Sequence, residues 1–142
     1  MKCLKKIFAV ILVCVLFASF GVQVSAGYEE RSPIMPRYEN ATGYNARFWI
    51  SNDQANVLVD YNGKSTTFTR AEITVKVQKR FLLVIWSDVG EWSASSTDLN
   101  GSFYKTFSVN GTGDYRALIT LTIYGNAGGV DTIEMTREYE YK

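Results

Sequence analysis

Apolar and polar residues alternate along much of this chain with the period of two that is typical of β-strands. The alternation is clearest over 55–61, 73–77 and 115–123, and a weaker example covers 103–109. Because successive side chains of a strand point to opposite faces, each segment predicts one apolar face and one polar face. Val84–Trp86 is expected to add a short strand of mixed character.

Turn residues separate the predicted strands. Four segments that contain Asn or Gly lie between or beside them: 62–63, 100–101, 110–114 and 126–129. Asn and Gly tolerate the positive φ that tight turns require. The last of these segments joins 115–124 to 130–141, which predicts a C-terminal hairpin. No segment has convincing helical amphipathicity, and about seven strands with regularly spaced turns predict an antiparallel β-sandwich or small barrel.

A tyrosine at the start of one predicted strand refines the architecture. Val109 and Gly111 precede Tyr115 by six and four residues. In Greek-key sandwiches a tyrosine placed in this way turns its hydroxyl back onto the upstream backbone, an arrangement called a tyrosine corner. The alternative is an ordinary core tyrosine. The fold prediction is therefore an all-β, antiparallel Greek-key immunoglobulin-like β-sandwich of about seven strands, preceded by a cleaved signal peptide.

The first 26 residues have the pattern of a secretory signal peptide. Three lysines among the first six residues precede an apolar run over 7–20, and Val24–Ala26 offers small residues at a cleavage site. We predict cleavage after Ala26 and secretion of the remaining chain. An uncleaved membrane anchor is one alternative, although the run is shorter than the roughly 20 apolar residues of a spanning helix. A lipoprotein attached through Cys14 is another.

The part of the chain beyond Ala26 divides into an extended arm over 27–45, which holds both prolines, and a sandwich domain over 46–142. Removal of the signal leaves 12 basic and 14 acidic residues, a net charge of −2. This near-neutral balance gives no electrostatic case for binding nucleic acid or for a polybasic attraction to membranes. We expect no membrane span after cleavage.

Missing residue types exclude most catalytic chemistry. The chain has no histidine, and Cys3 and Cys14 both leave with the signal, so no Ser-His-Asp triad, thiolate nucleophile or His- or Cys-ligated metal remains. Only carboxylate pairs of the glycosidase kind are left. The candidates are Asp88 with Glu91, and Glu134 with Glu138 or Glu140. The first pair fits a polar turn and the second a solvated strand face, so we predict no enzyme activity, no cofactor and no metal site.

Aromatic residues are abundant, with nine Tyr and three Trp in the chain. An exposed aromatic ring can form a stacking platform for a sugar ring, because its face is apolar and its edge polar. The alternative is a core tryptophan, which is most natural for Trp86. Trp92 lies next to polar turn residues, which favours exposure. Trp92 and Trp49 are therefore the predicted ligand-binding residues.

Three short motifs support a family resemblance: Ile73–Lys79, the two tryptophans Trp86 and Trp92, and Gly113–Ala117. In this order they resemble a family of small secreted proteins from Gram-positive bacteria of the Firmicutes type. The resemblance implies a bacterial source and an immunoglobulin-like β-sandwich, and it brings neither an activity nor site residues. The chain departs from the family at Phe81–Ile85, which is apolar where the family is polar and hairpin-like.

The functional prediction is a secreted, non-enzymatic β-sandwich that acts by surface recognition of another protein or a cell-wall polysaccharide. Loops at the ends of a sandwich commonly carry such binding. One alternative is a carbohydrate-binding module that uses Trp92 and Trp49. A second is an antimicrobial or toxin-like protein, although the chain lacks the cationic amphipathic segment that membrane attack usually employs. The sequence sets neither the strand order nor the oligomeric state.

Overall fold

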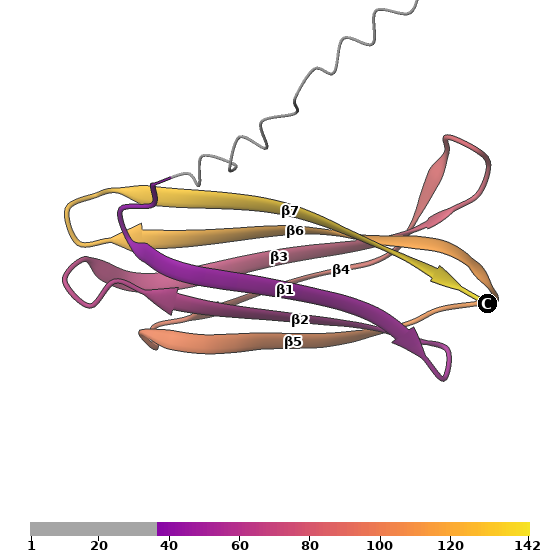
Figure 1. Ribbon diagram of the computed structural model, residues 1–142, viewed down its shortest axis with the longest axis horizontal. Coiled ribbons are helices and arrows are strands. Elements are labelled where there is room, and N and C mark those ends of the chain that lie inside the picture. Colours follow the sequence, from indigo (N-terminus) through magenta and orange to yellow (C-terminus); the bar gives the residue numbers. More distant parts are fainter. Residues whose placement is uncertain (1–36) are drawn as a thin grey trace, which may run out of the picture. The chain divides into compact units, whose positions relative to one another are not determined.

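The computed structural model describes residues 37–142 as seven antiparallel strands in two sheets, with no helix in that range (Figure 1). The strands are β1 (Ala41–Ser51), β2 (Gln54–Gly63), β3 (Phe68–Arg80), β4 (Trp86–Ser96), β5 (Asn100–Ser108), β6 (Gly113–Gly125) and β7 (Val130–Tyr141). This confirms the predicted all-β sandwich and its C-terminal hairpin. The predicted signal peptide, its cleavage site and most of the N-terminal arm lie outside the described residues.

The two sheets have the orders β1-β2-β5 and β4-β3-β6-β7. The chain passes from one sheet to the other between β2 and β3, between β4 and β5, and between β5 and β6, as a Greek-key sandwich requires. Strand β4 pairs with β3 and not with β5, unlike the fourth strand of a constant-type immunoglobulin domain. Along one edge, the Arg137 Nε atom donates to the Ala46 carbonyl at 3.1 Å and ties β7 to β1.

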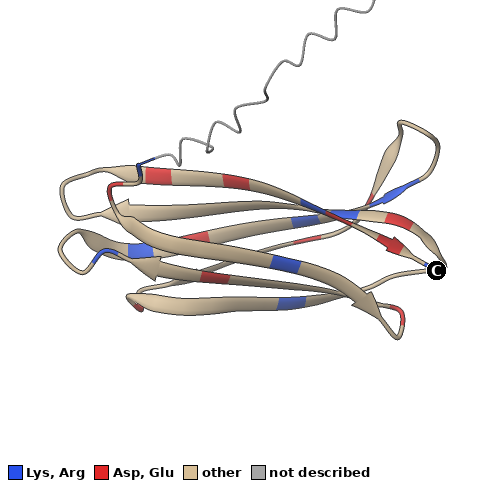
Figure 2. Cartoon of the chain, in the orientation of Figure 1, with Lys and Arg blue, Asp and Glu red and all other residues tan. Residues whose placement is uncertain are grey.

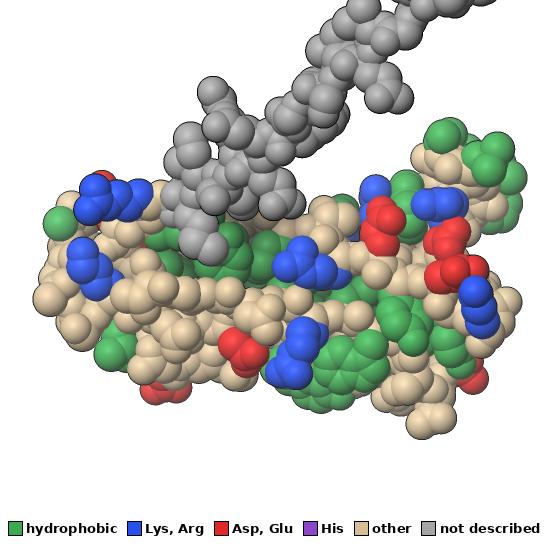
Figure 3. Space-filling model, in the orientation of Figure 1, with side chains coloured by type: hydrophobic (Ala, Val, Ile, Leu, Met, Phe, Trp, Pro, Cys, Tyr) green, Lys and Arg blue, Asp and Glu red, His purple; other side chains and the backbone are tan. Residues whose placement is uncertain are grey.

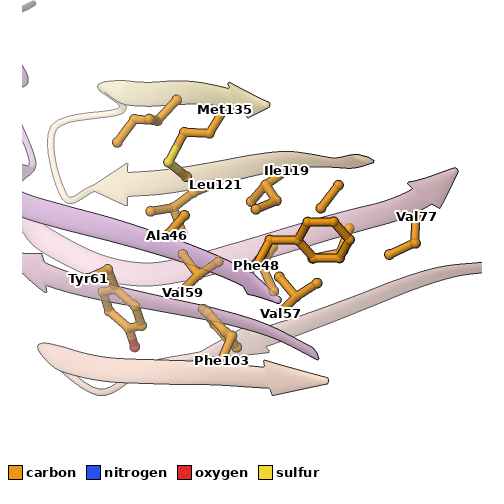
Figure 4. Close-up of a cluster of buried hydrophobic side chains, with 14 of the residues drawn as sticks. Ala46, Phe48, Val57, Val59, Tyr61, Val77, Phe103, Ile119, Leu121 and Met135 are labelled. Carbon is orange, nitrogen blue, oxygen red and sulfur yellow. The ribbon is translucent and has the colours of Figure 1, made fainter. Parts of the chain in front are cut away.

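The core lies between the sheets and is built from the predicted apolar faces. Every second residue of β2, β3 and β6 is buried, in the sets 55–61, 71–77 and 115–123. Figure 4 shows side chains from both sheets, among them Val59, Leu121 and Met135, which gather in this layer. The period-two pattern therefore identified the buried faces of β2, β3 and β6.

Tyr115 forms the predicted tyrosine corner. Its side chain is fully buried, and its hydroxyl lies 2.7 Å from the Gly111 carbonyl and 3.0 Å from the Asn110 carbonyl. Gly111 has a φ of 70°, which lets the loop fold back over the ring. The hydroxyl thus holds the β5–β6 connection against the start of β6.

The sandwich begins earlier than the predicted boundary at residue 46, because β1 already starts at Ala41. The Asp131 carboxylate, only 8% exposed, accepts hydrogen bonds from the backbone N–H groups of Glu39, Asn40 and Ala41 at 3.1, 2.6 and 3.1 Å. These bonds cross about 90 positions of sequence. Local periodicity carries no sign of them, so the sequence placed these residues in the arm.

The predicted short strand over Val84–Trp86 is wrong. Strand β4 starts at Trp86, which pairs with Arg80, and residues 81–85 form the turn between β3 and β4. The Phe81 N–H donates to the Ile85 carbonyl at 2.8 Å and closes the turn. An apolar run resembles a buried strand by composition alone, whereas here the pairing of its flanks makes it a hairpin turn.

Candidate functional site

Two exposed surfaces stand out on the described domain. The first, the aromatic face, consists of Trp49 on β1, Leu58 on β2 and Tyr104 on β5, all on the outer side of the three-stranded sheet. Trp49 and Leu58 are half-buried and Tyr104 is 54% exposed. Their sequence neighbours point into the core, so strand alternation turns these three side chains to solvent. The sheet that carries them is nearest the viewer in Figures 1 and 3.

The two rings of the aromatic face are held in a fixed relation. The centroids of Trp49 and Tyr104 lie 6.4 Å apart, and their planes differ by 28°. The Tyr104 hydroxyl lies 2.7 Å from Asn56 Oδ1, and Asn56 Nδ2 donates to the Gln54 carbonyl at 2.9 Å. Because Asn56 is only 6% exposed, this bond orients the tyrosine from beneath. The rings are therefore ordered before any ligand arrives.

Charged and polar groups border the aromatic face. Arg47 pairs with Asp60 at 3.7 Å, and the Ser102 hydroxyl lies 2.6 Å from the same carboxylate. The arginine side chain is 61% exposed, so its remaining donors face water. In the register of β1 and β2, Arg47 lies opposite Leu58 and Asp60 lies opposite Asn45, and Figure 2 shows basic and acidic segments on these two strands. Apolar rings beside exposed donors and acceptors suit a ligand with both C–H faces and hydroxyl groups.

Trp92 does not belong to this surface. It lies on β4, in the other sheet, and packs against the core next to Phe103 at a ring distance of 6.5 Å. The Lys105 ammonium covers part of its ring at 5.8 Å. The structure therefore places the two predicted ligand-binding tryptophans on different sheets, with Trp49 facing outward and Trp92 facing inward.

The second surface is the hairpin tip, residues 81–85. Its side chains are all apolar, and their exposed fractions are 72% for Phe81, 56% for Leu82, 91% for Leu83, 83% for Val84 and 50% for Ile85. The tip extends beyond the rest of the sandwich in Figure 1, and Figure 3 shows its hydrophobic side chains clustered there. The other exposed aliphatic residues, Leu99 and Val130, lie far apart in sequence, before β5 and at the start of β7.

Trp86 marks the base of the hairpin tip and is not a core residue. It lies half-buried on the outer side of the four-stranded sheet, with the guanidinium carbons of Arg116 and Arg80 at 4.1 and 5.0 Å from its ring centroid. Arg80 also pairs with Asp114 at 3.1 Å, and Arg116 Nε donates to Gln78 Oε1 at 2.8 Å. These contacts fix the root of the tip to β3 and β6.

Of the carboxylates considered for catalysis, Asp88 and Glu91 share one lysine as an ion-pair partner. Lys76 pairs with Asp88 at 3.4 Å and with Glu91 at 3.5 Å. A hydrogen bond from Gln78, supported by the charge of Lys76, lowers the pKa of Asp88 below its ordinary value, and Asp88 in turn raises the pKa of Lys76. The glutamates of β7 lie along its exposed side. Within residues 37–142, no group of three or more acidic residues is arranged to hold a metal ion.

The sequence predicts Trp49 as a ligand-binding residue, and Trp49 lies on the aromatic face; Tyr104 and the hairpin tip were not predicted. Tyr104 lies in the weakest predicted strand, and nothing local shows that β5 pairs with β2 and so brings this ring near Trp49. The tip had a visible signal, because Phe81–Ile85 breaks the polar-apolar alternation of its surroundings. The exposure of these residues, however, follows from the hairpin turn between β3 and β4, which the sequence did not predict.

No protein-family model and no curated protein sequence matches the chain significantly. Among solved structures, the solution structure of AT1g01470 from Arabidopsis thaliana is similar at 13% identity and a TM-score of 0.42, with 75% of this chain and 82% of that one covered. Wild-type OgpA from Akkermansia muciniphila is similar at 16% identity and a TM-score of 0.39, with 79% and 33% covered, so this chain spans about a third of OgpA. A protein from Archaeoglobus fulgidus is similar at 9% identity and a TM-score of 0.35, with 72% and 98% covered.

Proposed function

We propose that this chain is a secreted, non-enzymatic binding module whose ligand is a cell-wall polysaccharide, held on the aromatic face. The proposal includes export by the N-terminal signal, with cleavage after Ala26, and membership of the secreted Gram-positive family that the motifs resemble. The observation that carries it is the pair of ordered, outward-facing rings of Trp49 and Tyr104.

The chemistry of the face suits a sugar polymer. A pyranose ring presents C–H groups on its face and hydroxyls at its edge, so it can stack on an aromatic ring and bond to polar neighbours at once. Trp49 and Tyr104 supply the stacking surface, and Arg47 and Asp60 lie within the same sheet face as donor and acceptor. A sheet face is open at both ends, which accommodates a long chain molecule.

A polysaccharide fits this surface better than a folded protein does. A stable protein interface buries roughly 800 Å² on each partner and is centred on a desolvated apolar core. The aromatic face offers three apolar side chains, two of them half-buried. A sugar unit is itself small, so two rings and their polar neighbours can cover it.

Retention on insoluble polymers tests the proposal. The exported chain is mixed with purified cell walls, cellulose and chitin, and the pelleted fraction is measured. We expect retention on at least one polymer, and at least a tenfold loss of affinity for both Trp49→Ala and Tyr104→Ala. Tyr104→Phe tests the bond to Asn56 and should retain more binding than Tyr104→Ala, because the ring remains.

Tyr44→Ala is the matched control, because Tyr44 is an exposed tyrosine of β1 that lies outside the aromatic face. Thermal unfolding of every variant separates lost binding from lost fold. Equal retention of Tyr104→Ala and the unaltered chain, with both folded, would refute the assignment of the site. No retention on any polymer would refute the polysaccharide and leave a protein partner as the alternative.

A further inference from the structure

The hairpin tip exposes more apolar surface than an isolated domain needs. A continuous run of exposed apolar residues is a binding feature or an aggregation hazard, because contact of apolar surface with water is unfavourable in free energy. Moving one Leu or Val side chain from water into an apolar phase shifts an equilibrium roughly ten- to hundredfold. Five such residues at the end of one hairpin therefore give a strong drive towards an apolar environment.

The distribution of side chains around the tip indicates what kind of environment that is. A groove on a protein contacts one side of a hairpin, so the other side would remain polar. Here consecutive residues, which point to different sides, are all apolar, and the two at the apex, Leu83 and Val84, are 91% and 83% exposed. Apolar side chains on all sides of the tip favour an apolar phase that surrounds it over a groove that contacts one side.

The base of the tip combines an aromatic ring with two arginines, in contrast to the purely apolar apex. Trp86 lies there beneath Arg80 and Arg116, and tryptophan with arginine favours the level of lipid headgroups, where an amphipathic side chain meets both phases. Arg80 is paired with Asp114, whereas within residues 37–142 no carboxylate lies at ion-pair distance from Arg116. Arg116 has Glu138 opposite it on β7 and donates through Nε to Gln78, and its other guanidinium N–H groups are the local donors for phosphate.

We propose that the hairpin tip inserts into the interfacial layer of a lipid bilayer, with Trp86 and Arg116 at headgroup level. Leu83 is three residues from Arg80, so the tip reaches at most about 10 Å, which matches the depth at which amphipathic segments lie. Two hydrogen bonds, from the Phe81 N–H to the Ile85 carbonyl and from the Ile85 N–H to the Leu82 carbonyl, satisfy part of the turn's backbone. The hydrated interfacial layer can satisfy the remaining groups, which the hydrocarbon core could not.

Co-sedimentation with vesicles tests the insertion. The exported chain is mixed with vesicles of phosphatidylcholine alone and of phosphatidylcholine with phosphatidylglycerol. We expect binding to both, several-fold tighter on the anionic vesicles because of Arg116. The double variant Leu83→Ser/Val84→Ser should bind about a hundredfold more weakly, since two apex side chains are lost. Brominated lipids should quench the fluorescence of the unaltered chain, and Trp86→Phe should remove most of that quenching.

The matched control is Leu99→Ser/Val130→Ser, which removes one exposed Leu and one exposed Val elsewhere on the domain. All variants share the same N-terminal segment, so a difference between them belongs to the substituted residues. The proposal is overturned if the unaltered chain binds neither vesicle, or if the tip variant and the control bind equally. Gel filtration tests whether the tip binds a second copy of this chain instead. A dimer that is lost in the tip variant and kept in the control would assign the tip to that contact and overturn the insertion.

Discussion

The carboxylate of Asp131 should be among the groups on which the sandwich most depends. It accepts three backbone hydrogen bonds at the start of β1, at 2.6–3.1 Å, in a site that is 8% exposed. Asp131→Ala leaves the N–H groups of Asn40 and Ala41 buried without an acceptor, and each such loss costs about 1–3 kcal/mol. We expect a loss of about 4 kcal/mol in the free energy of unfolding for Asp131→Ala.

Asp131→Asn should cost about 2 kcal/mol, because the amide keeps one acceptor oxygen and turns a donor towards the remaining N–H groups. Urea unfolding measures both values, and hydrogen exchange of the Glu39–Ala41 amides locates the effect. Glu134→Gln is the control, since Glu134 lies exposed on the same strand, and it should change stability by less than about 0.5 kcal/mol. A loss below about 1 kcal/mol for Asp131→Ala, with unchanged amide protection, would show that the carboxylate does not hold the start of β1.

Three further outcomes follow from the described contacts. Tyr115→Phe removes the hydroxyl bond to the Gly111 and Asn110 carbonyls and should cost about 1 kcal/mol in urea unfolding; no change would mean that the corner is incidental. Trp92→Ala should destabilise the fold by about 3 kcal/mol in the same assay, because Trp92 packs on the core; retained stability with lost sugar binding would reverse its assignment. The lowered pKa of Asp88 stabilises the fold above the unfolded-state value of about 3.9, and this contribution disappears as the pH falls through the lower folded-state value. A carboxyl NMR titration should show a lowered midpoint for Asp88 in the unaltered chain and a higher midpoint for Asp88 in the Gln78→Ala variant. Equal Asp88 midpoints in the two proteins would contradict the hydrogen bond from Gln78 as the cause.

The core could be predicted from the sequence because burial on one strand face leaves a local record. The alternation of Val57 with Leu58, or of Ile119 with Thr120, reflects which side of a strand meets the other sheet. The tyrosine corner was also readable, since Gly111 and Tyr115 are close in sequence. Such features need no knowledge of strand order.

The candidate site was less predictable because it depends on which strands become neighbours. Tyr104 faces the same side as Trp49 only because β1 and β5 flank β2, and Asp131 reaches Asn40 across 91 positions. Apolar residues at 81–85 look buried by composition, but the pairing of Arg80 with Trp86 turns them to solvent. Local patterns record burial in a strand and not the partner of that strand.

The three tryptophan indole N–H signals in one ¹H–¹⁵N spectrum test whether the aromatic face binds sugar. Trp49 lies on the aromatic face, Trp86 at the base of the hairpin tip and Trp92 against the core. Soluble fragments of the retained polysaccharide should shift the Trp49 signal and leave those of Trp86 and Trp92 in place. A sugar-dependent shift of Trp92 without Trp49, or no shift of any indole at saturating sugar, would contradict the assignment of the aromatic face as the binding site.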